Sequence, residues 1–139
     1  MVIAVDFDGT IVTHEYPGIG KEIPFAINTL KKLQTEGHHQ LILWTVREGE
    51  LLNEAVEYCR SQGLEFYAIN SSYPEIETEN IGQQPRKLNA ELFIDDRNLG
   101  GLPDWGIIYR MIMSGEPWKP TSGVATDMQP PKKKGWFGR

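Results

Sequence analysis

The sequence predicts an α/β fold built on a mainly parallel central sheet. Short apolar runs rich in β-branched and aliphatic residues, as in strands buried on both faces, recur along the chain. Amphipathic segments with helical periodicity alternate with these runs, so each strand would connect to the next through a right-handed helical crossover. Polar residues suited to chemistry follow several of the runs directly.

Four apolar runs predict the strands of the sheet. The first run ends at Asp6, the second ends at Thr45, and the fourth ends at Asp95. The third runs into Asn70 rather than into an acidic residue. The predicted strands cover residues 2–5, 41–44, 66–69 and 92–94.

Three amphipathic segments predict the helices. The first begins near Pro24, because proline fits the first position of a helix, and ends before Gly37, which suits a C-terminal cap. The second covers residues 48–62 and ends at Gly63. The last begins at residues 103–104 and continues through an apolar stripe of isoleucine and methionine.

Length and charge divide the chain into one domain, residues 1–115, and a short tail, residues 116–139. The 139 residues suit a single domain, and the tail is expected to be flexible because it is rich in proline and poor in apolar residues. The domain carries nine Lys/Arg against seventeen Asp/Glu, and the tail five against two. The acidic domain argues against nucleic acid as a partner. The basic end of the tail, Lys132 to Arg139, is read as solvated in preference to binding an anionic surface.

Several features lead us to expect a cytoplasmic protein. The single cysteine, Cys59, builds no intramolecular disulfide and falls on the apolar face of a predicted helix, so we expect it to pack in the core. The first residues run straight into a strand without the basic region of a signal peptide. No apolar run approaches the ~20 residues of a membrane span, so we expect no membrane partner.

Polar side chains gather where the predicted strands end. In open parallel sheets the ligand binds beyond the carboxyl ends of the strands, so residues distant in sequence would meet in one crevice. Four of them are carboxylates, which cannot all stay ionised together without a compensating charge. The residues are Asp6 and Asp8 after the first strand, Thr45 after the second, Lys87 before the fourth, and Asp95 and Asp96 after it.

This set of residues predicts a magnesium site for phosphoryl chemistry. Mg²⁺ prefers oxygen ligands and is typically held by one or two carboxylates together with phosphate. No histidine or cysteine stands at these strand ends, which argues against zinc. One of Asp6 and Asp8 could attack phosphorus while the other handles the proton. Thr45 and Lys87 could hold the phosphate, and Arg47 could reach the substrate or pair with a nearby glutamate instead.

These residues resemble the motifs of the haloacid dehalogenase (HAD) superfamily of phosphatases and phosphotransferases. Lys87 stands where the third motif of the family has its lysine. The match runs in the family's order over residues 2–96. The other three motifs are matched by Asp6-Phe7-Asp8-Gly9-Thr10-Ile11, by Leu41-Ile42-Leu43-Trp44-Thr45 and by Leu92-Phe93-Ile94-Asp95-Asp96.

The resemblance implies a role for each matching residue. Asp6 would be the nucleophile that forms an aspartyl-phosphate, and also a magnesium ligand. Asp8 would act as general acid and then base, and would touch the metal through its backbone carbonyl. Thr45 and Lys87 would hold the phosphate. Magnesium would also be bound by Asp95, and by Asp96 directly or through water.

The resemblance further implies a three-layer, Rossmann-like fold with no cap domain, because the segments between the motifs are too short to hold one. The expected site is open and flanked by residues 11–22 and 70–85. Its substrate would be a small phosphorylated molecule, and a homo-oligomer is compatible with the family. His14 could contact this substrate, although a solvated loop residue is the simpler interpretation. Tyr16 could stack on a ring of the substrate, although anchoring of its loop is the simpler interpretation. The alternatives are a phosphotransferase and a receiver-like, non-catalytic phosphate-binding module.

Overall fold

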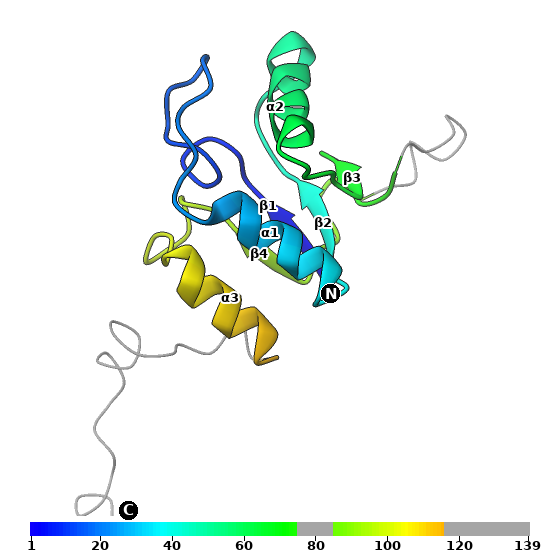
Figure 1. Cartoon of the computed structure of the whole chain (residues 1–139). Coiled ribbons are helices and arrows are strands. Elements are labelled where there is room, and N and C mark those ends of the chain that lie inside the picture. Colours follow the sequence, from blue (N-terminus) through cyan, green and yellow to red (C-terminus); the bar gives the residue numbers. More distant parts are fainter. Residues whose placement is uncertain (75–84, 116–139) are drawn as a thin grey trace, which may run out of the picture.

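The computed structural model, which describes residues 1–74 and 85–115, is an α/β fold with a four-stranded parallel sheet (Figure 1). The strand order is β3-β2-β1-β4. This confirms the predicted fold class and is consistent with a Rossmann-like fold. The elements are β1 (Val2–Val5), α1 (Ala26–Thr35), β2 (Gln40–Leu43), α2 (Gly49–Ser61), β3 (Ala68–Ile69), β4 (Leu92–Ile94) and α3 (Trp105–Met113).

Strand β1 lies between β2 and β4, and its last residue is in register with the last residues of both neighbours. Val5 pairs with Leu43 on one side and with Ile94 on the other. The Asp6 N–H then donates to the Ile94 carbonyl at 3.0 Å. The residues that follow β1 and β4 therefore lie side by side at the carboxyl edge of the sheet.

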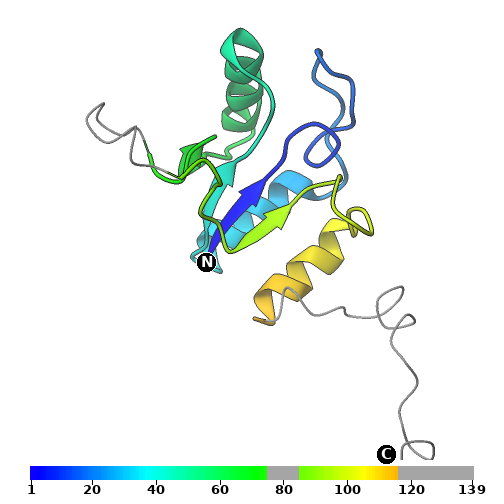
Figure 2. The same cartoon turned by 180° about the vertical axis from the view of Figure 1, so that it is seen from behind.

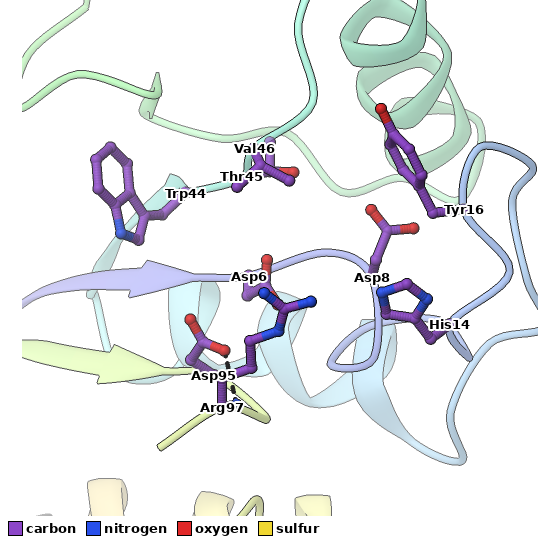
Figure 3. Close-up of a pocket in the computed structure, with 9 residues that line it drawn as sticks. All are labelled: Asp6, Asp8, His14, Tyr16, Trp44, Thr45, Val46, Asp95 and Arg97. Atoms are coloured by element: carbon purple, nitrogen blue, oxygen red, sulfur yellow. Dashed lines mark hydrogen bonds between the residues drawn. The ribbon is translucent and has the colours of Figure 1, made fainter. Parts of the chain in front are cut away.

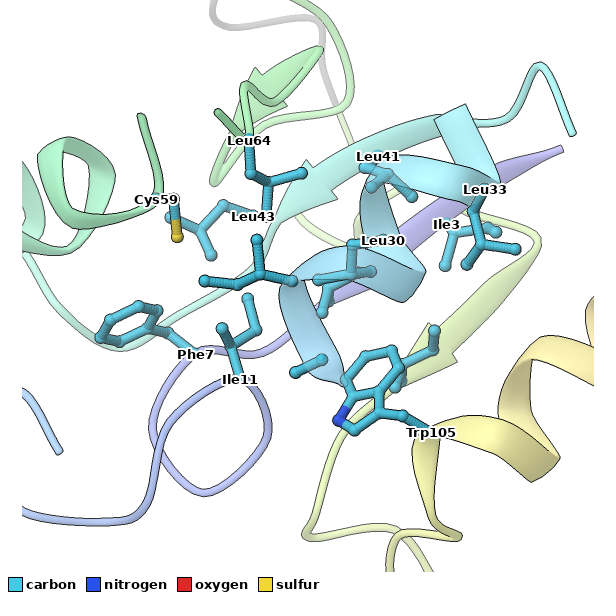
Figure 4. Close-up of a cluster of buried hydrophobic side chains, with 14 of the residues drawn as sticks. Ile3, Phe7, Ile11, Leu30, Leu33, Leu41, Leu43, Cys59, Leu64 and Trp105 are labelled. Carbon is cyan, nitrogen blue, oxygen red and sulfur yellow. The ribbon is translucent and has the colours of Figure 1, made fainter. Parts of the chain in front are cut away.

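The three helices share one hydrophobic core on one face of the sheet (Figure 4). Because successive strand residues point to opposite faces, Ile3 and Val5 face this core while Ala4 faces the other side. Both α1 and α2 connect strands that step in the same direction across the sheet, so right-handed crossovers place them on the same face. The last helix, α3, folds back to pack against α1.

The opposite face of the sheet carries no helix within residues 1–74 and 85–115 (Figure 2). Its smaller buried cluster comprises Ala4, Ile42, Ala68 and Leu88. The described part of the protein thus has two layers, where three were expected. A third layer would have come from the connection between β3 and β4, whose described parts, residues 70–74 and 85–91, are not helical.

Element boundaries differ from the predictions by a few residues. Helix α1 begins at Ala26, because Phe25 takes a left-handed conformation (φ 69°) before the first turn. Helix α3 begins at Trp105, where the Asp104 side chain accepts a hydrogen bond from the Ile107 N–H at 3.0 Å and caps the helix. Strand β3 has two residues rather than four.

Cys59 is fully buried in the main core, as predicted, and burial raises the pKa of its thiol to about 12. The helices of the described chain are all too short or too polar to cross a membrane. The predicted tail, residues 116–139, lies outside the described residues, and so does part of the segment that would show whether a cap is absent, residues 75–84.

Candidate functional site

Three carboxylates from the ends of two neighbouring strands converge at the carboxyl edge of the sheet. Asp6 follows β1, and Asp95 and Asp96 follow β4. One oxygen of each lies within 4.8 Å of the other two, an arrangement that could hold a metal ion. The in-register pairing of β1 with β4 produces this convergence.

The environment of Asp6 disfavours its negative charge. Its pKa is raised to about 7, first by burial, then by the charge of Asp95, with a smaller contribution from Asp96. The Phe7 N–H opposes this shift by donating to the carboxylate. Three crowded carboxylates offer only hard oxygen donors, which is the donor set that Mg²⁺ prefers, so these residues fit that ion.

The loop after β1 holds the acidic cluster in place through Thr10 and Gly9. The fully buried Thr10 hydroxyl lies 3.4 Å from Asp6 Oδ2 and 3.3 Å from Asp96 Oδ1, and it accepts the Asp96 N–H at 3.0 Å. Gly9 has φ +86°, and a Cβ there would clash with Asp96 Oδ2. Both residues stand in the first motif, but no role was predicted for Thr10.

Asp8 lies outside the three-carboxylate cluster, because its side chain is paired with Arg47. Arg47 Nε donates to Asp8 Oδ2 at 2.7 Å, and the Nη2 atom donates to Oδ1 at 2.8 Å. Both side chains are buried, with relative exposures of 8% for Asp8 and 1% for Arg47. The metal contact predicted for Asp8 is through its backbone carbonyl, which this pairing leaves free of Arg47, and Asp8 replaces the Glu48 or Glu50 partner considered for Arg47.

The contacts of Arg47 also differ from those expected of a residue that binds substrate. Its remaining N–H groups donate to the backbone carbonyls of Pro17, Gly18 and Leu51. A guanidinium has five N–H donors, and all five are engaged within the protein. Contacts with the rings of Phe7 and Tyr16, each 5.2 Å from the guanidinium carbon, enclose the group further.

Asn70 fixes the backbone around Thr45. Its Oδ1 accepts the Thr45 N–H at 2.8 Å, while its own N–H donates to the Leu43 carbonyl at 2.8 Å. The Thr45 hydroxyl accepts the Arg47 N–H at 3.1 Å. The hydroxyl proton of Thr45 is therefore available to an acceptor in the site. The Asn70 contact was missed in sequence analysis, because it depends on a left-handed residue (φ 52°) at the end of β3.

A cavity of about 380 Å³ opens at this edge of the sheet (Figure 3). Of the predicted site residues, Asp6, Asp8, Thr45 and Asp95 line it, and so do His14 and Tyr16 from the loop after β1. Trp44, Val46 and Arg97 complete the lining and were not predicted.

Lys87 is exposed and does not line this cavity. The cationic side chain in the lining is that of Arg97, whose guanidinium is drawn toward Asp6 in Figure 3. The backbone N–H of Arg97 donates to Asp95 Oδ1 at 2.9 Å. A signal for Arg97 was present in the sequence, because it directly follows the Asp95-Asp96 pair.

No family model matches the chain, and no curated protein matches it either. Among solved structures, a conserved protein from Bacteroides thetaiotaomicron matches with a TM-score of 0.76 and 62% sequence identity. The match covers 86% of this chain and 98% of that protein. At this identity and coverage, the chain belongs to the same family as the conserved Bacteroides thetaiotaomicron protein.

Proposed function

We propose that the protein is a magnesium-dependent phosphomonoester hydrolase that works through an aspartyl-phosphate on Asp6. The observation that carries this proposal is the convergence of Asp6, Asp95 and Asp96 at the edge of an open cavity that Asp6, Asp95 and Thr45 line. The four motifs that resemble the HAD superfamily support the same reaction. When bound to the three carboxylates, Mg²⁺ would neutralise charge on the phosphate and on Asp6.

The first half of the reaction transfers the phosphoryl group to the protein. A carboxylate oxygen of Asp6 attacks phosphorus, and the bond from phosphorus to the ester oxygen breaks. Asp8 gives a proton to the departing oxygen. In the second half Asp8 takes a proton from water, the water oxygen attacks phosphorus, and the bond to Asp6 breaks to release phosphate.

Thr45 is suited to hold a phosphate oxygen. Because its hydroxyl oxygen already accepts the Arg47 N–H, its own proton can be donated to the substrate. Arg97 lines the cavity and would supply a positive charge for the phosphate, whereas the cavity lining gives no support to the role that the family implies for Lys87.

The experiment is to assay purified protein with p-nitrophenyl phosphate, with magnesium and with EDTA. Hydrolysis should require magnesium and fall at least a hundredfold in Asp6→Asn, because the nucleophile is lost. Asp104→Asn is the matched control, since Asn caps a helix as well as Asp does and residue 104 lies outside the cavity lining.

Unchanged activity in Asp6→Asn would contradict the nucleophile assignment. Product formed only when an alcohol acceptor is added would indicate the phosphotransferase. Magnesium-dependent phosphate binding without turnover would indicate the non-catalytic module.

A further inference from the structure

The Arg47 side chain joins two stretches of the loop after β1 to the first turn of α2 beside the proposed site. It pairs with Asp8 in the loop after β1, with two carbonyls at Pro17 and Gly18, and with Leu51 in the first turn of α2. The contacts to Asp8 and Gly18 are 2.7–2.8 Å long, and those to Pro17 and Leu51 are 3.2 and 3.3 Å. Few rotations of either partner preserve this set of contacts.

The geometry leaves Asp8 fixed but still able to act. Arg47 takes one acceptor position on each carboxylate oxygen. A carboxylate has about four such positions, so each oxygen keeps a further one. Asp8 lines the cavity, where a leaving-group oxygen would lie.

We propose that Arg47 is the positioning residue for proton transfer, holding Asp8 toward the leaving group without touching the substrate. This inference rests on the proposed function. Arg47 cannot bind substrate in this arrangement, because its five donors are all used and its side chain is buried. Its contribution should therefore appear only where the reaction needs the proton that Asp8 supplies.

The choice of leaving group separates this role from a merely structural one. p-Nitrophenolate departs readily as an anion, whereas the alkoxide of glycerol phosphate needs a proton as it leaves. General acid catalysis contributes about 10²–10⁴-fold where it is needed. Loss of Asp8 positioning should thus slow the alkyl ester much more than the aryl ester.

The test is a double-mutant cycle on Asp8→Asn and Arg47→Lys, assayed with both esters. Lysine keeps the positive charge but cannot form the bidentate pair together with the three carbonyl contacts. We expect Arg47→Lys to lower kcat for glycerol phosphate about a hundredfold and kcat for p-nitrophenyl phosphate less than about tenfold. In the Asp8→Asn background it should cause no further loss beyond about twofold. Arg60→Lys, in a surface pair with Glu57 and Glu65, is the control and should match the wild type.

Circular dichroism and Tm establish whether each variant is folded. If Arg47→Lys is unfolded at the assay temperature, Arg47→Gln in the Asp8→Asn background leaves no buried charge unpaired and is compared with Asp8→Asn alone. Equal losses on the two esters, or a further loss of tenfold or more in the Asp8→Asn background, would overturn the positioning role. Absence of magnesium-dependent hydrolysis by the wild type would instead overturn the proposed function.

Discussion

At the scale of single residues, the proposed site sets an unfavourable acidic cluster beside a well-satisfied ion pair. The Asp6 carboxylate is crowded by Asp95 and Asp96 and has its pKa raised to about 7. Asp8, two residues away, has a guanidinium on both oxygens. The acidic cluster therefore suits a cation, whereas the pairing with Arg47 holds the Asp8 side chain in one orientation.

The raised pKa of Asp6 predicts a pH-dependent stability of the metal-free protein. Between the unfolded value of 3.8 and about 7, the folded state binds more protons than the unfolded state. The contribution of Asp6 to the free energy of unfolding is therefore present at low pH and is lost as the pH rises through about 7. We expect Asp6→Asn to raise Tm in EDTA at pH 8 and to raise it much less at pH 5. Scanning calorimetry at both pH values tests this, and equal shifts would contradict it.

Two cationic residues give opposite predictions for phosphate binding. Arg97 lines the cavity and Lys87 does not. Because a hydrogen bond to a charged group contributes about 1.5–3 kcal/mol, Arg97→Ala should weaken competitive inhibition by inorganic phosphate roughly tenfold or more. Lys87→Ala should change the inhibition constant by less than about twofold, and Arg60→Ala serves as a surface control. A larger effect from Lys87→Ala would restore the role that the family resemblance implies.

At the scale of elements, loops rather than strands hold the site together. The loop after β1 supplies Gly9 and Thr10, and the backbone carbonyl of Thr10 accepts the Trp105 indole N–H from α3 at 3.1 Å. The turn after β2 is held by Asn70 at the end of β3. Each loop is thereby joined to an element distant in sequence, which limits how far the acidic cluster can relax.

Gly9→Ala tests this tight packing. The added methyl group would clash with the Asp96 carboxylate, and the φ of +86° disfavours alanine. We expect magnesium affinity, measured by titration calorimetry, to fall at least tenfold because Asp96 is displaced. Gly115→Ala is the matched control, since its φ is +80° with no contact within 4 Å, and it carries the backbone strain without the clash. Equal effects of the two changes would assign the loss to strain alone.

At the scale of the whole molecule, the helices cover one face of the sheet and the site occupies its carboxyl edge. The acidic cluster links the inner strand β1 to the edge strand β4. A cation bound there would hold together two strands and the loops after them. Its binding should therefore stabilise the entire domain.

Magnesium should consequently raise the melting temperature. At a concentration ten times its Kd, a ligand specific for the folded state contributes about 1.4 kcal/mol, or roughly 5 °C for a domain of this size. The shift should be larger at pH 8 than at pH 5, because protons compete with the metal for the carboxylates. Differential scanning fluorimetry with and without EDTA measures it. An undiminished shift in Asp95→Asn would argue that the metal binds elsewhere.

The hydrophobic pattern was sufficient to predict the fold class and to place much of the acidic cluster at one edge of the sheet. Buried runs that end in Asp6 and Asp95 predict a parallel sheet, and parallel strands bring their carboxyl ends to one edge. The face of the sheet that the helices cover was harder to predict. The family resemblance implied three layers, whereas the described residues carry helices on one face only. Helix α1 starts two residues later than Pro24 predicts, because Phe25 takes a left-handed conformation that the hydrophobic pattern does not encode.

The sequence by itself predicted that Asp6, Asp8, Asp95 and Asp96 would lie at one edge of the sheet, because parallel strands bring their carboxyl ends together. It also placed Thr45 at the same edge. Only the tertiary structure decided the partner of Arg47, the engagement of Thr10 and Asn70, and the presence of Arg97 rather than Lys87 in the cavity lining. These outcomes depend on side-chain rotamers and loop conformations, which are selected by packing between segments far apart in the chain.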